Sequence, residues 1–222
     1  MRLSLLALAA AAFSLVALGC TRTEAAPAAP ASPLADGAAV PPRMGTAVFA
    51  GGCFWSMERV FDGQRGIQRA VSGFSGGTTV SPSYESTFTN PAGHVEAVQV
   101  VFDPAVISYE TLVRLFWHNV DPTAGERQFC DQGPTYRAAI FPQTTAQRRV
   151  AEASLAQVRA RLRQPVVATI RATAPFYALP DVHQDFARRN PARYEQYRRG
   201  CRRGDRLHEI WGAAAETAGS RI

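Results

Sequence analysis

The sequence contains no lysine, because all 24 of its basic residues are arginine. Schiff-base formation, phosphate-binding P-loops and lysine general-base catalysis all require a lysine amine, so these classes of chemistry are excluded. Cysteine and histidine are also scarce, with four of each. No C-x-x-C pair occurs, and no histidine stands at metal-ligand spacing from a cysteine. We therefore expect no metal and no other cofactor.

Charge of one sign does not form a long uninterrupted block in the chain. The net charge is +6, but the arginines are interspersed with acidic residues, which is typical of solvated helix faces. We expect no nucleic-acid partner. A length of 222 residues with 46% hydrophobic residues is sufficient for a single core, and no internal repeat is present. We expect one domain and a monomer.

The N-terminus has the pattern of an export signal. A short basic start precedes an apolar run over residues 3–18, which is shorter than the roughly 20 residues that span a bilayer. The run ends in Ala17-Leu18-Gly19-Cys20, which is similar to the lipobox of bacterial lipoproteins. This predicts an exported protein, periplasmic or in the cell envelope, with a lipid anchor on Cys20. Ordinary signal cleavage in the same Ala-rich stretch is the alternative.

Composition divides the chain into four parts. Residues 1–19 form the predicted signal peptide, and the Ala/Pro-rich residues 20–43 cannot bury a core and form a disordered linker. A catalytic domain is predicted for residues 44–213, followed by a tail of residues 214–222. Within the domain, short apolar runs alternate with longer amphipathic ones, which indicates an α/β (α+β) fold. Strands are expected at 46–50, 94–102, 137–141 and 166–173, and helices at 54–61, 108–119, 147–163 and 181–197, the last interrupted at Pro191.

Cys53 is the candidate nucleophile. It stands between the glycines of a predicted turn, Gly51-Gly52, and the start of a predicted helix. Free amide groups and the positive end of a helix dipole lower the pKa of a thiol from about 8.5 toward roughly 3.5 to 7.5. We therefore expect a reactive thiolate at this position. A free cysteine in the core is the alternative, since unpaired cysteines are often buried.

Glu96 is the candidate general acid. It lies in the predicted strand 94–102, where both faces are apolar, so its carboxyl is buried whichever face meets the core. Burial raises the pKa of a carboxyl and keeps it protonated at neutral pH. Pairing with an arginine is the alternative. Further along, Cys130, Asp131 and Tyr136 cluster in a polar turn.

The chain resembles peptide methionine sulfoxide reductases of the A type. The resemblance covers roughly residues 46–191 and follows the family's order of motifs: Gly51-Gly52-Cys53-Phe54-Trp55, Gly73-Phe74-Ser75-Gly76-Gly77, Pro82-Ser83-Tyr84-Glu85, Gly93-His94-Val95-Glu96, Phe116-Trp117, Asp131-Gln132-Gly133 with Tyr136-Arg137, and His183-Gln184. It implies an α/β roll with a mixed sheet surrounded by helices. It also implies thiol-dependent reduction of methionine (S)-sulfoxide, in proteins and as the free amino acid, for repair of oxidative damage.

The resemblance assigns roles to individual residues. Cys53 would attack the sulfoxide sulfur and become a sulfenic acid, and Glu96 would protonate the oxygen. Tyr84 and Tyr136 would donate hydrogen bonds to that oxygen. The substrate methyl group would be held by Phe54 and Trp55, and Asp131 would orient the polar side of the pocket.

Recycling of the oxidised Cys53 requires a second thiol. Cys201 is flanked by four arginines, which favour its thiolate, and by Gly200 and Gly204, which we expect to let the segment swing. Cys130 precedes Asp131, whose charge disfavours a thiolate. We predict that Cys201 forms the intramolecular disulfide and that Cys130 is auxiliary or structural, with Cys130 as the alternative resolving residue. The reductant would be an exported thioredoxin-like dithiol protein.

Two other functions are compatible with a reactive Cys53. One is a Cys-His hydrolase or acyltransferase, with His94 or His183 as base. The other is a non-enzymatic lipoprotein adaptor, in which the thiol is unreactive.

Overall fold

The computed structural model describes residues 32–33, 43–89 and 92–215. The predicted signal peptide, the anchor residue Cys20 and most of the linker lie outside these ranges. Within them, no helix has the length and apolar character needed to cross a membrane.

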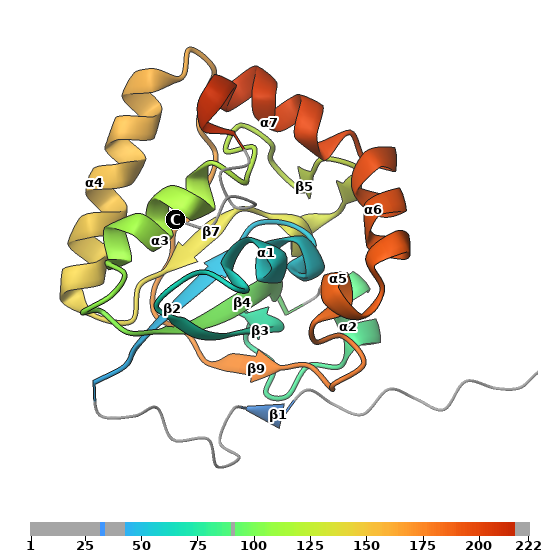
Figure 1. Cartoon of the computed structure of the whole chain (residues 1–222). Coiled ribbons are helices and arrows are strands. Elements are labelled where there is room, and N and C mark those ends of the chain that lie inside the picture. The colour runs from blue at the N-terminus through green and yellow to red at the C-terminus, as the bar shows by residue number, and fades with distance from the viewer. Residues whose placement is uncertain (1–31, 34–42, 90–91, 216–222) are drawn as a thin grey trace, which may run out of the picture.

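A seven-stranded mixed sheet forms the centre of the fold, in the order β1-β9-β3-β4-β2-β7-β8 (Figure 1). All neighbouring strands are antiparallel except β7 and β8, which run parallel. A separate two-stranded ribbon pairs β5 with β6. The strands are β1 (Ser32–Pro33), β2 (Gly45–Ala50), β3 (Ile67–Ser75), β4 (Val95–Phe102), β5 (Arg127–Gln128), β6 (Asp131–Gln132), β7 (Ala139–Phe141), β8 (Thr169–Ile170) and β9 (Phe176–Ala178).

Helices surround this sheet. Figure 1 shows α3 and α4 on one side of α1, and α6 on the other. The helices are α1 (Phe54–Phe61), α2 (Tyr84–Thr89), α3 (Tyr109–Trp117), α4 (Thr145–Arg161), α5 (Phe186–Arg189), α6 (Pro191–Gly200) and α7 (Arg203–Trp211). Short 3-10 turns lie at Pro134–Tyr136 and Gly212–Ala214. The mixed sheet with surrounding helices confirms the predicted fold class.

Both faces of the central strands are buried. In β2, Ala47 and Phe49 belong to the larger hydrophobic cluster, which includes residues of α1, α3, α4 and α7. Val48 and Ala50 point the other way, into a smaller cluster with Phe141. Burial on both faces explains why β2 and β4 have nearly continuous apolar sequences instead of an alternating pattern.

Several elements differ from the sequence-based expectation. The strand expected over 166–173 is reduced to β8, Thr169–Ile170, and neither β3 nor β9 was among the expected strands. The predicted interruption at Pro191 is confirmed, since α5 ends at Arg189 and Pro191 begins α6, where its missing N–H costs no hydrogen bond. The helical region starts at Phe186 instead of Asp181. α1 begins and ends at the predicted residues, and Ser108 caps α3 as predicted by accepting a hydrogen bond from the Thr111 N–H.

Candidate active site

Cys53 lies at the junction between β2 and α1. It is the N-cap of α1, and its carbonyl accepts hydrogen bonds from the N–H groups of Ser56 at 3.0 Å and Met57 at 3.2 Å. Gly52 has φ +82°, and a Cβ built there would lie 2.4 Å from the Cβ of Gln128. Glycine is therefore required by both conformation and space, and it fixes where the chain presents the thiol.

The Cys53 thiol is buried, with 7% exposure. Burial raises its pKa, and the charges of Glu96 and Asp131 act in the same direction. Hydrogen bonding with the Tyr197 side chain and with the Trp55 backbone lowers the pKa, but it does not offset these effects. The expectation of a pre-formed thiolate was therefore wrong, since one helix end cannot outweigh desolvation combined with two carboxyls. The resting site holds a protonated thiol.

Glu96 lies on β4 with 3% exposure, so the predicted burial is confirmed. The pKa of its carboxyl is raised to about 8, mainly by burial and in part by the nearby charge of Asp131. The Phe54 N–H donates a hydrogen bond to Glu96 Oε2 at 2.9 Å and opposes the shift. No arginine forms an ion pair with Glu96 in the part of the chain that the structure describes. Glu96 therefore carries a proton at neutral pH.

Both predicted tyrosines lie close to Cys53 and Glu96. Tyr84 starts α2, and Tyr136 ends the 3-10 turn Pro134–Tyr136. Burial raises the pKa of both phenols, and the charges of Glu96, Asp131 and Cys53 raise it further. Both hydroxyls therefore remain hydrogen-bond donors beside the thiol and the carboxyl.

Phe54 and Trp55 form an aromatic wall behind the thiol. Phe54 is 1% exposed and contacts the rings of Trp55 and Tyr84. The Trp55 ring stacks on Phe186 of α5, with centroids 3.7 Å apart. The C-terminal segment thus contributes directly to the surroundings of the site.

Tyr197, on α6, was not anticipated from the sequence. Its hydroxyl donates a hydrogen bond to Asp131 Oδ2 at 2.5 Å and is also hydrogen-bonded to Cys53. Tyr197 and Asp131 are 66 positions apart, and Tyr197 belongs to none of the motifs. No local pattern could have identified it.

Cys130 and Cys201 form a disulfide with Cα atoms 4.9 Å apart, while Cys53 is free. Cys130 is exposed, and Cys201 is half-buried as the C-cap of α6. The glycine-flanked tail that we expected to swing is helical in this disulfide-bonded state. Gly200 ends α6 and Gly204 lies within α7, so both glycines are helical.

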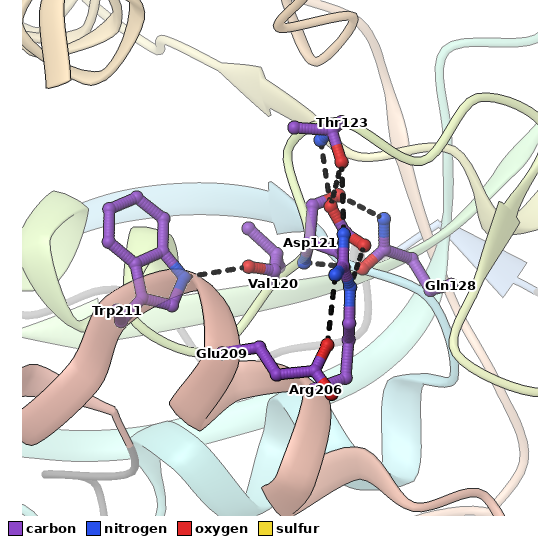
Figure 2. A network of polar contacts seen from close by, with 7 residues as sticks. All are labelled: Val120, Asp121, Thr123, Gln128, Arg206, Glu209 and Trp211. Atoms are coloured by element: carbon purple, nitrogen blue, oxygen red, sulfur yellow. Dashed lines mark hydrogen bonds and ion pairs between the residues drawn. The ribbon is translucent and has the colours of Figure 1, made fainter. Parts of the chain in front are cut away.

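A polar network holds α7 against the loop that precedes Cys130 (Figure 2). The Arg206 Nε donates to Asp121 Oδ2 at 2.8 Å, and the Trp211 indole N–H donates to the Val120 carbonyl at 3.0 Å. Gln128, which is fully buried, exchanges hydrogen bonds with the backbone of Asp121 at 2.8 and 3.0 Å. Since Gln128 also packs on Gly52, the network connects α7 with the turn that carries the nucleophile.

His94 and His183, the candidate bases of a Cys-His hydrolase, do not act on Cys53 in this structure. His94 is 1% exposed, its Nε2 bonds the Thr79 carbonyl at 2.8 Å, and its ring lies edge-on to Tyr177. His183 stacks on Tyr84 instead. Among the residues with described positions, neither ring is hydrogen-bonded to Cys53. The hydrolase alternative has no support in this geometry.

Comparison with known proteins agrees with the geometry. The family model for peptide methionine sulfoxide reductase matches residues 45–215. Peptide methionine sulfoxide reductase MsrA of Bacillus subtilis (strain 168) is 46% identical over 169 residues, covering 75% of this chain and 96% of the relative. MsrA 2 of Caulobacter vibrioides is 44% identical over 172 residues, covering 77% of this chain and 87% of the relative.

Solved structures share the fold. Methionine sulfoxide reductase A of Corynebacterium diphtheriae aligns with a TM-score of 0.61 at 29% identity, covering 68% of this chain and 76% of that one. Reduced Mxr1 of Saccharomyces cerevisiae aligns with a TM-score of 0.64 at 24% identity, covering 68% of this chain and 88% of that one. At this identity the similarity shows the fold alone. With a family model matched over most of its length and relatives above 40% identity, this chain belongs to the peptide methionine sulfoxide reductase family.

Proposed function

We propose that this protein reduces methionine (S)-sulfoxide, in oxidised proteins and as the free amino acid, with Cys53 as nucleophile and Glu96 as general acid. The observation that carries the proposal is the buried Cys53 thiol beside a buried carboxyl whose pKa is raised to about 8. A protonated carboxyl can donate to the sulfoxide oxygen at neutral pH, which a carboxylate cannot do.

The reaction starts from the doubly protonated pair. Cys53 Sγ attacks the sulfoxide sulfur and forms an Sγ–S bond, while the Glu96 proton passes to the sulfoxide oxygen and the thiol proton replaces it on Glu96. The hydroxyl then shifts to Sγ, so that an Sγ–O bond forms as the S–O and Sγ–S bonds of the substrate sulfur break. Methionine is released and Cys53 remains as a sulfenic acid. The substrate sulfur gains two electrons and Cys53 loses two. This exchange needs no free thiolate in the resting enzyme, which fits the raised pKa of Cys53.

The remaining site residues bind the sulfoxide group. Tyr84 and Tyr136 donate hydrogen bonds to its oxygen, because both phenols stay protonated beside Glu96. Phe54 and Trp55 hold the methyl group against their rings. Asp131, held by Tyr197, orients the polar side of the pocket.

Recycling passes through Cys201 and then Cys130. The Cys201 thiol condenses with the Cys53 sulfenic acid to form a disulfide and water, and the Cys130 thiol then displaces Cys53 from Cys201. The product is the Cys130–Cys201 disulfide seen here, with Cys53 returned to the thiol. Cys130 is exposed and Cys201 lines a surface pocket of about 240 Å³, so an external thioredoxin-like dithiol can reach them.

The location is a separate part of the proposal. A lipid on Cys20 would anchor the enzyme in the cell envelope, with residues 20–43 as spacer. Cys20→Ala should abolish incorporation of labelled fatty acid. Label retained on that variant would contradict the anchor and leave ordinary secretion.

A reductase assay with dithiothreitol and separated sulfoxide epimers tests the activity itself. We expect turnover of the S epimer, no turnover of the R epimer, and no hydrolysis of a chromogenic ester. Ester hydrolysis without sulfoxide reduction would contradict the proposed function and favour the hydrolase.

A further inference from the structure

Residues 181–186 pack against two aromatic side chains of the site. This segment follows β9 and ends at Phe186, the first residue of α5. Its His183 ring stacks on Tyr84 with centroids 4.7 Å apart, and its Phe186 ring stacks on Trp55 at 3.7 Å. No strand pairing holds residues 181–186, whose backbone hydrogen bonds are local turns such as His183 N–H to the Pro180 carbonyl. Side-chain hydrogen bonds supply the contacts of this segment with β3 and α1.

Two side chains fasten the segment to β3 at Ser72, which is fully buried. Gln184 Oε1 accepts from the Ser72 N–H at 2.8 Å, and its Nε2 donates to the Ser72 carbonyl at 2.9 Å. Glu58 Oε1 accepts from the Asp185 N–H at 2.9 Å, and Glu58 Oε2 accepts from the Ser72 hydroxyl at 2.9 Å. Glu58 thereby joins α1, β3 and the segment through one carboxyl.

The position of Glu58 relates it to the site. It is 3% exposed and lies one helical turn after Phe54, whose N–H is bonded to Glu96. Asp185, its partner, has φ 54°, a left-handed conformation that is uncommon outside glycine. Such a conformation persists only where surrounding contacts hold it, and the bond to Glu58 is one of these contacts.

We propose that Glu58 is a positioning residue for sulfoxide binding. It holds the 181–186 segment in place, and the two rings of that segment in turn support Tyr84 and Trp55. The inference rests on the proposed function, since these two side chains matter here only as sulfoxide contacts.

Proton linkage gives the role a distinct signature. Burial raises the pKa of Glu58 from 4.5 to about 7, opposed by the hydrogen bonds from Asp185 and Ser72. The charges of Asp185 and Asp62 also raise it, and the exposed Arg188 is the cation of α5 that faces this group. Release of the segment would hydrate Glu58 and lower its pKa. The held state therefore binds more protons, so rising pH loosens the segment until the pH passes about 7.

Single-turnover mixing of the reduced protein with N-acetylmethionine (S)-sulfoxide separates binding from chemistry. Glu58→Ala should raise the half-saturating concentration about fivefold or more while the maximal rate stays within about twofold. Glu58→Gln keeps an oxygen for the Asp185 N–H, so it should bind like the wild type at low pH. It should also lose the weakening of binding that the wild type shows between about pH 5 and pH 8.

Glu110→Gln is the matched control, because it removes an exposed acid of α3 that takes no part in these hydrogen bonds and is not among the charges acting on Glu58, and both parameters should stay unchanged. Folded Glu58→Ala with an unaltered half-saturating concentration would overturn the proposal. If Glu58→Ala does not fold, the Gln variant decides, since a pH dependence identical to the wild type would overturn it equally. Absence of turnover in the wild type would instead contradict the proposed function.

Discussion

Replacing Glu96 by glutamine tests the general acid in two independent ways. The amide matches the carboxyl in size and can still accept from the Phe54 N–H, but it has no proton to transfer. General-acid catalysis contributes about 10²- to 10⁴-fold, so we expect the single-turnover rate to fall by that factor, equivalent to about 3–5 kcal/mol of barrier. Thermal unfolding of the variant should change little, because the buried hydrogen bond is retained.

The pH dependence is the sharper test. A carboxyl with a pKa of about 8 is protonated below that pH, so the acid form is lost as pH rises. About 90% of Glu96 is protonated at pH 7 and about 10% at pH 9, which predicts a roughly tenfold fall in the maximal single-turnover rate across that range. The glutamine variant should lack this decline. If the glutamine variant loses activity but its rate still falls between pH 7 and pH 9 as in the wild type, the assignment of Glu96 is refuted, since another group would then be titrating.

Two further predictions concern recycling and the docking of α7. With a protein dithiol as reductant, Cys201→Ser should release one methionine per protein and then stop with Cys53 as a sulfenic acid. Cys130→Ser should stop at a Cys53–Cys201 disulfide. If peptide mapping finds a Cys53–Cys130 crosslink formed at full rate in Cys201→Ser, the roles of the two cysteines in recycling are reversed. Arg206→Ala should lower the free energy of unfolding by about 1–2 kcal/mol in urea denaturation, because its partner Asp121 has only 9% side-chain exposure. Arg202→Ala, which breaks an exposed pair, should cost less than about 0.5 kcal/mol, and equal losses would contradict the role of the network.

Elements with strong local signals were predictable from the sequence. α1 follows a glycine pair that requires a turn, and the burial of Glu96 follows from apolar residues on both faces of its strand. β9 escaped prediction because it has only three residues, and it owes its existence to pairing with β1 and β3 rather than to its own pattern. Long-range pairing of this kind leaves no local trace.

Site residues that belong to the sequence motifs were predictable, whereas residues that only tertiary packing brings to the site were not. Tyr197 reaches Asp131 only because α6 is folded back, and the Cys130–Cys201 disulfide depends on the same docking. The pKa of Cys53 was predicted in the wrong direction because a helix start can be recognised in a sequence. The degree of desolvation and the approach of two carboxyls cannot be recognised there.

The central claim is that Cys53 takes the oxygen from the sulfoxide. It is tested most directly by mixing a Cys130→Ser/Cys201→Ser double variant with one equivalent of methionine (S)-sulfoxide in the presence of dimedone, followed by mass spectrometry of the peptides. The account predicts one methionine per protein and a dimedone adduct on Cys53. Neither product should form when the Cys53→Ser substitution is introduced into the same double variant. Methionine formed without an adduct on Cys53, or formed by the Cys53→Ser variant, would contradict it.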